Sequence, residues 1–227
     1  LLMVSRKLYE CVKKVQEEGL FSQAGLRGFD LKGKTIGILG TGRIGVHMIK
    51  MVKGFDMKVI AFDAHPKDNL AQELGFSYVS FDDLLAQSDI VSVHLPYMKE
   101  THHILNVDNI AKMKKGSVLI NTARGALVET EALVKGLREG ILLGVGLDVL
   151  EEEGFVEDET RLLFSAHPNE ASLKTTLANH YLIEHPRAII APHNAFNTEE
   201  AIKRILDTTV ENVTAFGHGE VKNLIPA

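Results

Sequence analysis

Short apolar runs and segments of helical spacing alternate along most of the chain. The apolar runs with the length of buried strands lie at 35–39, 58–63, 89–94, 117–122 and 142–147, with shorter ones at 78–79 and 188–191. The segments whose apolar residues recur every three or four positions lie at 44–52, 68–74, 80–87, 106–114, 129–139, 171–183 and 198–216. Strands that alternate with helices in this way predict an α/β fold, a Rossmann-type doubly wound parallel sheet.

The beginning of the chain and the stretch after residue 153 do not follow this alternation. Apolar residues at helical spacing predict one amphipathic helix over 1–18, which ends at Gly19 and is followed by a glycine-rich loop. Neither a start methionine nor a capping residue precedes that helix, so we expect further sequence upstream. The stretch 154–187 is long and polar, and insertions of this length are usually functional or carry small structures of their own.

The composition narrows the class of protein. The 227 residues are 45% hydrophobic and 24% charged, as in a globular protein with a large core. The formal net charge of −5 and the lack of a basic run argue against nucleic-acid binding. No apolar stretch approaches the roughly 20 residues of a membrane span. Cys11 is the only cysteine, which excludes an internal disulfide and fits a reducing, cytoplasmic compartment.

The first long apolar run leads into the motif Gly40-x-Gly42-x-x-Gly45, and a helical pattern follows. In a strand–turn–helix context Gly40 permits the tight turn, Gly42 lets a pyrophosphate approach the backbone, and Gly45 lets the helix pack close to the strand. The helix N-terminus then offers free N–H groups to phosphates. A glycine-rich turn with no ligand is the alternative for the bare motif.

Asp63 makes a dinucleotide the better interpretation. It ends the next predicted strand, 18 residues after Gly45, where an acid can accept a hydrogen bond from the 2′-hydroxyl of an adenosine ribose. Its negative charge would repel a 2′-phosphate, so we expect NAD rather than NADP as the cofactor, although the nearby Lys67 is a contrary signal.

Several candidate residues follow predicted strands, and the carboxyl ends of parallel strands share one edge of the sheet. Arg124 could bind a substrate carboxylate through two hydrogen bonds. His193 could give or take a proton during hydride transfer. One of Glu151, Glu152 and Glu153 could orient that histidine, and spacing alone does not choose among them.

Other chemistry receives less support. Arg124 could instead be a surface charge, and His193 a loop histidine with a structural partner. The remaining histidines lack the spacing of a metal site, so we expect no metal. No Gly-x-Ser-x-Gly elbow is present, which argues against an α/β-hydrolase.

These segments together resemble the D-isomer-specific 2-hydroxyacid dehydrogenases, over about residues 19–216. The segments that carry the resemblance are 25–45, 91–96, 119–125, 147–153 and 191–196. Two features are similar to the D-lactate dehydrogenase branch, namely the sequence His193-Asn-Ala-Phe196 and the long segment between Glu153 and His193.

The resemblance implies a role for each matching residue. Arg124 matches the arginine that binds the substrate carboxylate, His193 the catalytic acid/base, and Glu153 the acid paired with it. The residues that match positions around the cofactor are Gly40, Gly42, Arg43, Ile44, Gly45, Asp63, Leu95, Pro96, Thr101, Thr122, Ala123 and Asp148.

The resemblance also implies a domain organisation and a reaction. We expect an interdomain hinge helix at 1–18, an NAD-binding domain at 19–196 with the 154–187 insertion, and a return helix and tail at 197–227 that lead toward an absent substrate domain. The expected activity is NAD-dependent interconversion of a D-2-hydroxy acid and a 2-keto acid, most simply D-lactate and pyruvate, by a homodimer. Without the segment that closes over the cofactor, this chain would turn over poorly. An NAD(H)-binding interaction or corepressor-like module is the alternative.

Overall fold

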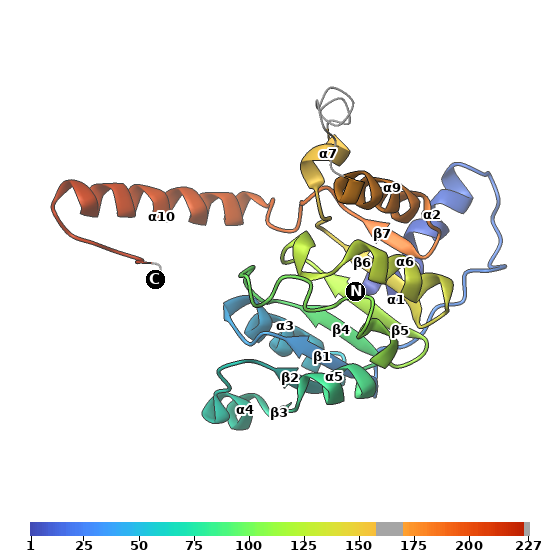
Figure 1. Cartoon of the computed structure of the whole chain (residues 1–227), viewed down its shortest axis with the longest axis horizontal. Helices are drawn as coiled ribbons and strands as arrows, with labels where there is room; N and C mark the ends of the chain where they lie inside the picture. Colours follow the sequence, from blue (N-terminus) through green and yellow to red (C-terminus); the bar gives the residue numbers. More distant parts are fainter. Residues whose placement is uncertain (158–169, 225–227) are drawn as a thin grey trace. The chain divides into compact units, whose positions relative to one another are not determined.

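A computed structural model describes residues 1–157 and 170–224. The chain forms two compact units, Leu1–Ala191 and Pro192–Ala227. In its described part, the first unit contains a sheet of seven strands in the order β3-β2-β1-β4-β5-β6-β7, and every neighbouring pair is parallel. This confirms the predicted fold class, because the order reverses beside β1, as in doubly wound nucleotide-binding sheets (Figure 1).

Outside 1–18 and 106–114, the bounds of the elements lie close to those of the predicted segments. The strands are β1 Thr35–Leu39, β2 Lys58–Phe62, β3 Ser77–Tyr78, β4 Ile90–Val93, β5 Ser117–Asn121, β6 Leu142–Leu147 and β7 Ala188–Ile190. The helices are α1 Leu2–Arg6, α2 Leu8–Gln16, α3 Arg43–Lys53, α4 Asp68–Leu74, α5 Phe81–Gln87, α6 Thr130–Arg138, α7 Glu153–Glu157, α9 Glu170–Glu184 and α10 Glu199–Gly217. Single 3-10 turns occur at Ile110–Lys112 (η1) and Gly125–Leu127 (η2).

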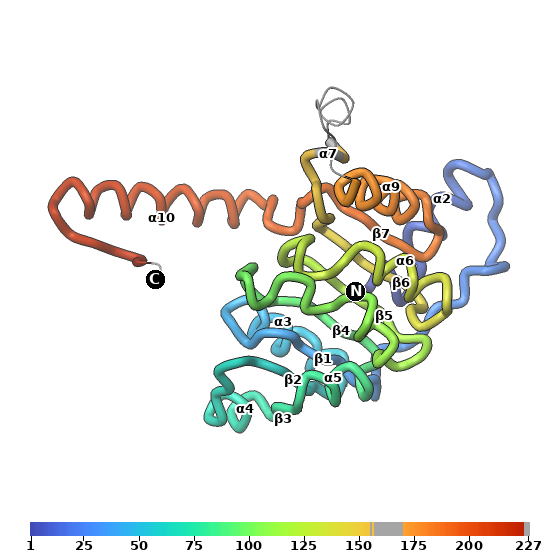
Figure 2. Tube along the Cα trace, viewed as in Figure 1, coloured from blue at the N-terminus to red at the C-terminus, as the bar shows by residue number. Residues whose placement is uncertain are grey.

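Two apolar cores lie on opposite faces of the sheet. Alternate residues of a strand point to opposite faces, so Ile36 and Ile38 of β1 belong to one core while Leu39 belongs to the other. α3 covers the first core through Ile49 and Val52. α5, α6 and α9 cover the second core, and the path of the chain between strands can be followed in Figure 2.

The expected single helix over 1–18 is wrong, because Lys7 separates α1 from α2 with left-handed backbone angles (φ 49°, ψ 44°). The cause lies far along the sequence. The Phe29 N–H donates to the carbonyl of Ser5 at 2.9 Å, and a Cβ on Gly28 would come within 2.2 Å of that oxygen. The Lys7 ammonium also donates to Gly25 O at 2.9 Å. The loop that contains Phe29 therefore occupies the Ser5 carbonyl, which in a continuous helix would accept a hydrogen bond from the next turn.

The expected helix at 106–114 is also wrong, because only the turn η1 forms there. Asparagine side chains bond to the nearby backbone and compete with helical hydrogen bonds. Asn109 Oδ1 accepts from the Asn106 N–H at 2.9 Å, and Asn109 Nδ2 donates to Ile104 O at 2.8 Å. The Val107 N–H donates to Glu129 Oε2 at 2.8 Å.

The second unit contains α10, whose first turn is capped by Thr198. Thr198 Oγ1 accepts the Ala201 N–H at 3.1 Å, and two acids follow in the first turn. Of the 154–187 insertion, α7 and α9 are described, while residues 158–169 lie outside the described part. The roles expected for 1–18 as a hinge and for 197–227 as a return segment stay predictions.

Candidate functional site

The glycine turn between β1 and α3 has the geometry of a phosphate-binding turn. Gly40 has φ +92°, and a Cβ there would lie 2.8 Å from His94 O. A Cβ on Gly45 would lie 2.0 Å from Gly40 O, so Gly45 lets α3 pack against the turn. A Cβ on Gly42 would meet nothing within 4 Å, which leaves open space beside the start of α3. No side-chain hydrogen bond caps α3, so no side chain takes up its first N–H groups. Arg43 and Ile44 begin that helix, and Ile44 is 66% exposed.

Asp63 follows β2 and is fixed against the same turn. Its Oδ2 accepts hydrogen bonds from the Thr41 N–H at 2.7 Å and the Thr41 hydroxyl at 2.8 Å, and its Oδ1 accepts the His65 N–H at 2.9 Å. Partial burial would raise the pKa of Asp63, but the hydrogen bonds from His65 and Thr41 together with the charge of His65 lower the pKa below its usual value. The carboxylate is therefore charged at neutral pH, as recognition of ribose hydroxyls requires.

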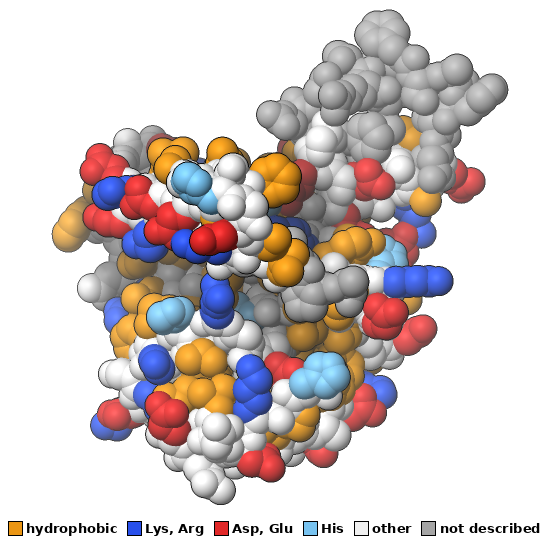
Figure 3. Space-filling model, turned by 90° about the vertical axis from the view of Figure 1, so that its left-hand side faces the viewer, with side chains coloured by type: hydrophobic (Ala, Val, Ile, Leu, Met, Phe, Trp, Pro, Cys, Tyr) orange, Lys and Arg blue, Asp and Glu red, His pale blue; other side chains and the backbone are white. Residues whose placement is uncertain are grey.

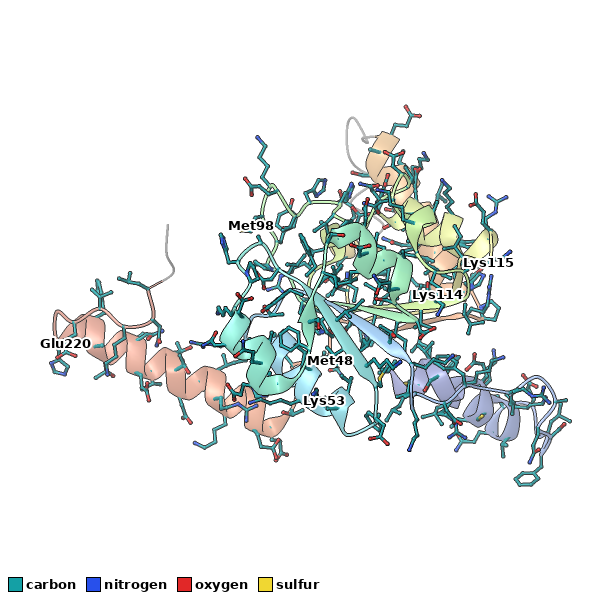
Figure 4. All side chains as sticks on the ribbon, turned by 90° about the horizontal axis from the view of Figure 1, so that it is seen from below. Met48, Lys53, Met98, Lys114, Lys115 and Glu220 are labelled. Carbon is teal, nitrogen blue, oxygen red and sulfur yellow. The ribbon has the colours of Figure 1, made fainter. Side chains whose placement is uncertain are left out.

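Leu95, Pro96 and Thr101, which match positions around the cofactor, lie in the loop after β4. Thr101 is buried and closes this loop, because its hydroxyl donates to Pro96 O at 2.7 Å and accepts the Met98 N–H at 2.8 Å. Leu95 packs against the apolar core that contains Leu39. Met98 marks this edge of the sheet in Figure 4, while Lys114 and Lys115, which precede β5, lie at the opposite edge.

Arg124 is presented by a short loop after β5, next to Thr122 and Ala123. Asn121 is buried and shapes this loop, because its Nδ2 donates to Arg124 O at 2.9 Å and its Oδ1 accepts the Ala123 N–H at 3.0 Å. The Arg124 side chain is exposed, and its Nη1 donates to Ala123 O at 2.6 Å. The sequence analysis missed this role of Asn121. A polar residue at the end of a predicted buried strand could have indicated it.

The loop of Arg124 touches the turn that carries the glutamate triplet. A Cβ on Gly125 would lie 2.0 Å from Leu150 O and 2.5 Å from the Glu151 N, so only glycine permits this approach. Glu153 begins α7, and its Oε1 accepts the Leu150 N–H at 3.1 Å. Asp148 follows β6 and is 7% exposed, and its N–H donates to Asn121 O at 2.9 Å. Arg124, Asp148 and Glu153 therefore belong to two connected loops at one edge of the sheet.

His193 lies three residues after β7, at the start of the second unit. Its backbone is left-handed (φ 48°), and its ring meets Phe196 edge to face with centroids 6.0 Å apart. The first unit thus contains the predicted cofactor residues together with Arg124 and Glu153, and the second contains His193.

Three further results concern metal ions, membranes and surface charge. Among residues 1–157 and 170–224, no group of three or more His, Cys, Asp or Glu side chains could hold a metal ion. Within the same residues, no helix combines the length and the apolar character that crossing a membrane requires. In Figure 3 the Lys and Arg side chains do not gather in one patch but are interspersed with Asp and Glu.

Comparisons with known proteins identify the family of the chain. Residues 1–195 match the family model described as "D-isomer specific 2-hydroxyacid dehydrogenase, NAD binding domain". The chain is 37% identical to a glyoxylate reductase of Thermococcus litoralis, over 97% of this chain and 62% of the relative. It is 34% identical to a D-lactate dehydrogenase of Escherichia coli, over 97% of this chain and 64% of the relative.

The fold also matches solved structures. One is a D-lactate dehydrogenase of Aquifex aeolicus complexed with NAD and lactic acid, with a TM-score of 0.85 and 35% identity over 96% of this chain and 64% of that one. The chain thus spans less than two thirds of the length of these relatives. The expected cofactor, NAD, is confirmed at the level of the family. The chain belongs to the D-isomer specific 2-hydroxyacid dehydrogenase family and comprises its NAD-binding domain.

Proposed function

We propose that this protein interconverts a D-2-hydroxy acid and its 2-keto acid with NAD, and that D-lactate and pyruvate are its substrate pair. The relative from Escherichia coli is named a D-lactate dehydrogenase, and the similar Aquifex aeolicus structure is complexed with NAD and lactic acid. The relative from Thermococcus litoralis is named a glyoxylate reductase, which makes glyoxylate the second acid to test.

One observation supports this proposal most strongly. The close approach of Gly125 to the backbone of Leu150 and Glu151 holds the Arg124 loop against the turn that leads to Glu153. Both loops follow strands of a parallel sheet, at the same edge as the glycine turn and Asp63. A carboxylate-binding arginine and an acid next to a dinucleotide turn are the groups that a hydroxyacid dehydrogenase needs.

Each residue then has a definite role. The Arg124 guanidinium binds the substrate carboxylate through two hydrogen bonds and thereby orients the adjacent carbonyl carbon. His193 holds the proton that is given to the carbonyl oxygen on reduction and taken from the hydroxyl on oxidation. By the family resemblance, Glu153 is the acid that is paired with this histidine.

The cofactor is held by the residues around the glycine turn. Gly40, Gly42 and Gly45 receive the pyrophosphate with the N–H groups of α3, and the Asp63 carboxylate accepts the ribose hydroxyls. When bound there, NAD supplies or accepts the hydride. Asp148, by the family resemblance, holds the nicotinamide carboxamide.

Loss of NADH absorbance with 2-keto acids tests the proposal in the product of the complete gene. We expect oxidation of NADH with pyruvate, and loss of nearly all of that rate in His193→Gln while NADH binding is retained. An unchanged rate in His193→Gln would refute the role of that histidine. NADH binding without oxidation by any 2-keto acid would instead favour the NAD(H)-binding interaction module.

A homodimer and a cytoplasmic location complete the proposal. Family analogy supports the homodimer. The cytoplasmic location is supported by the single cysteine, Cys11, which leaves the chain without an internal disulfide. Light scattering on the purified protein tests the dimer, since a monomer at micromolar concentration would contradict it.

A further inference from the structure

Glu151 lies in a polar network that the family resemblance does not explain. Both oxygens of its carboxylate accept hydrogen bonds, although its side chain is only 11% exposed. Oε2 accepts from the Thr130 N–H at 2.6 Å and the Thr130 hydroxyl at 2.8 Å. Oε1 lies 2.5 Å from His103 Nε2, which donates to it. A buried carboxylate with three donors is costly to leave unpaired, so its surroundings are strongly constrained.

The partners of Glu151 enclose the loop of Arg124. His103 has a left-handed backbone (φ 49°), and its N–H donates to Ala126 O at 2.9 Å, two residues after Arg124. Thr130 begins α6, at the far end of the same segment. The segment 124–130 is thus tied to Glu151 at Thr130 directly and at Ala126 through His103.

The network also includes the insertion helix α9. Asn179 is fully buried on α9, and its Nδ2 donates to the backbone oxygen of Glu151 at 2.7 Å. α9 packs against α6, as Figure 1 shows. The insertion therefore contributes a hydrogen bond that holds the main chain two residues before Glu153.

We propose that Glu151 is a positioning residue that fixes the Arg124 loop and the Glu153 turn relative to each other, and that His103 and Asn179 act through it. Its carboxylate holds the segment after Arg124, and its own backbone leads directly to Glu153. The catalytic consequence rests on the proposed function, whereas the positioning of the two segments does not.

The neutral amide of Glu151→Gln keeps the shape of the side chain but replaces the carboxylate that accepts hydrogen bonds from His103 and Thr130. Hydrogen–deuterium exchange in peptides covering 124–130 and 150–153 should become several-fold faster than in the unchanged protein. A misplacement of about 1 Å at a reacting group can cost about 100-fold in rate, so we expect kcat/KM for the 2-keto acid to fall about 10- to 100-fold. The Kd for NADH should change by less than about 2-fold, because the glycine turn is separate from this network.

Glu152→Gln is the matched control. It makes the same charge change at the next residue, whose carboxylate accepts one hydrogen bond from the Ser172 hydroxyl at 3.4 Å. We expect it to leave both the exchange rates and kcat/KM unchanged. His103→Gln, at a partly exposed residue, is the second variant in case Glu151→Gln does not fold. The double variant should lose no more activity than the more damaging single one, because the two residues act as one unit.

The outcomes separate the inference from the proposed function. Unchanged exchange in both Glu151→Gln and His103→Gln would overturn the inference, as would faster exchange with full activity. If the unchanged protein oxidises no NADH with any 2-keto acid, the proposed function fails, and the exchange rates alone decide whether Glu151 positions the two segments.

Discussion

His94 makes the free energy of unfolding depend on pH, and the size of this effect follows from the pKa shift of its ring. It follows β4, its Nε2 lies 2.9 Å from the Ser92 hydroxyl, and its backbone oxygen packs against Gly40. Burial lowers the pKa of His94 from 6.5 to about 4 in the folded chain. The folded state therefore keeps the ring neutral at pH values where the unfolded chain binds a proton.

The sign of the effect follows from that difference. Stability from this group is fully present above pH 6.5 and is lost as the pH falls from 6.5 to about 4. Because one pKa unit corresponds to about 1.4 kcal/mol, the full loss is about 3 kcal/mol. Between pH 7 and 5 it is on the order of 2 kcal/mol.

Urea unfolding followed by circular dichroism between pH 7 and 5 measures this loss, with His94→Asn as the comparison. The hydrogen bonds and nearby charges of Asp63 and Asp89 lower their pKa values below 3.8, despite partial burial, so both groups titrate below this range. The stability advantage of the unchanged protein over His94→Asn should therefore shrink by on the order of 2 kcal/mol from pH 7 to 5. An advantage that is constant across this range would refute the reasoning.

Three further predictions concern the glycine turn and its surroundings. Gly45→Ala should lower both the Tm and the affinity for NADH, because its Cβ would lie 2.0 Å from Gly40 O. Gly42→Ala should lower the affinity for NADH but leave the Tm unchanged, because its Cβ would meet nothing within 4 Å, and equal Tm losses in the two variants would contradict this. Asp63→Ala should weaken NADH binding about 10-fold and shift the ratio of the two affinities toward NADPH, because it removes both the acceptor for the ribose hydroxyls and a charge that repels a 2′-phosphate. Fluorescence titration with both nucleotides checks this, and an unchanged ratio would count against the role of Asp63. Ser80→Ala should reduce the free energy of unfolding by about 1 kcal/mol without changing NADH affinity, because its Oγ accepts the Asp83 N–H at 3.1 Å; equal denaturation midpoints would contradict the cap.

Most of the fold could be predicted from local sequence patterns. The buried strands are continuous apolar runs, and a parallel sheet places everything that follows them at one edge, so Gly40, Asp63 and Asp148 could be grouped from sequence alone. Helix starts at Ser80 and Thr198 were also predictable, because each cap bonds three residues ahead.

Features that depend on distant contacts could not be predicted. The break at Lys7 arises because Phe29 takes the Ser5 carbonyl, and no local signal marks it. Spacing could not choose within the glutamate triplet, and one partner of Glu151 lies 48 residues away at His103. Tertiary packing determines non-local pairs of this kind, and the helix or strand propensity of a residue says nothing about tertiary packing.

The central claim is tested most directly by the initial rate of NADH oxidation by the product of the complete gene. The substrates are pyruvate, glyoxylate and acetone, and acetone is a ketone without a carboxylate. We predict rapid oxidation with at least one of the two acids and none with acetone, and a fall of at least about 100-fold with the acids in Arg124→Gln, because the carboxylate loses its bidentate partner. Rates that are equal for the acids and acetone, or unchanged in Arg124→Gln, would contradict the account.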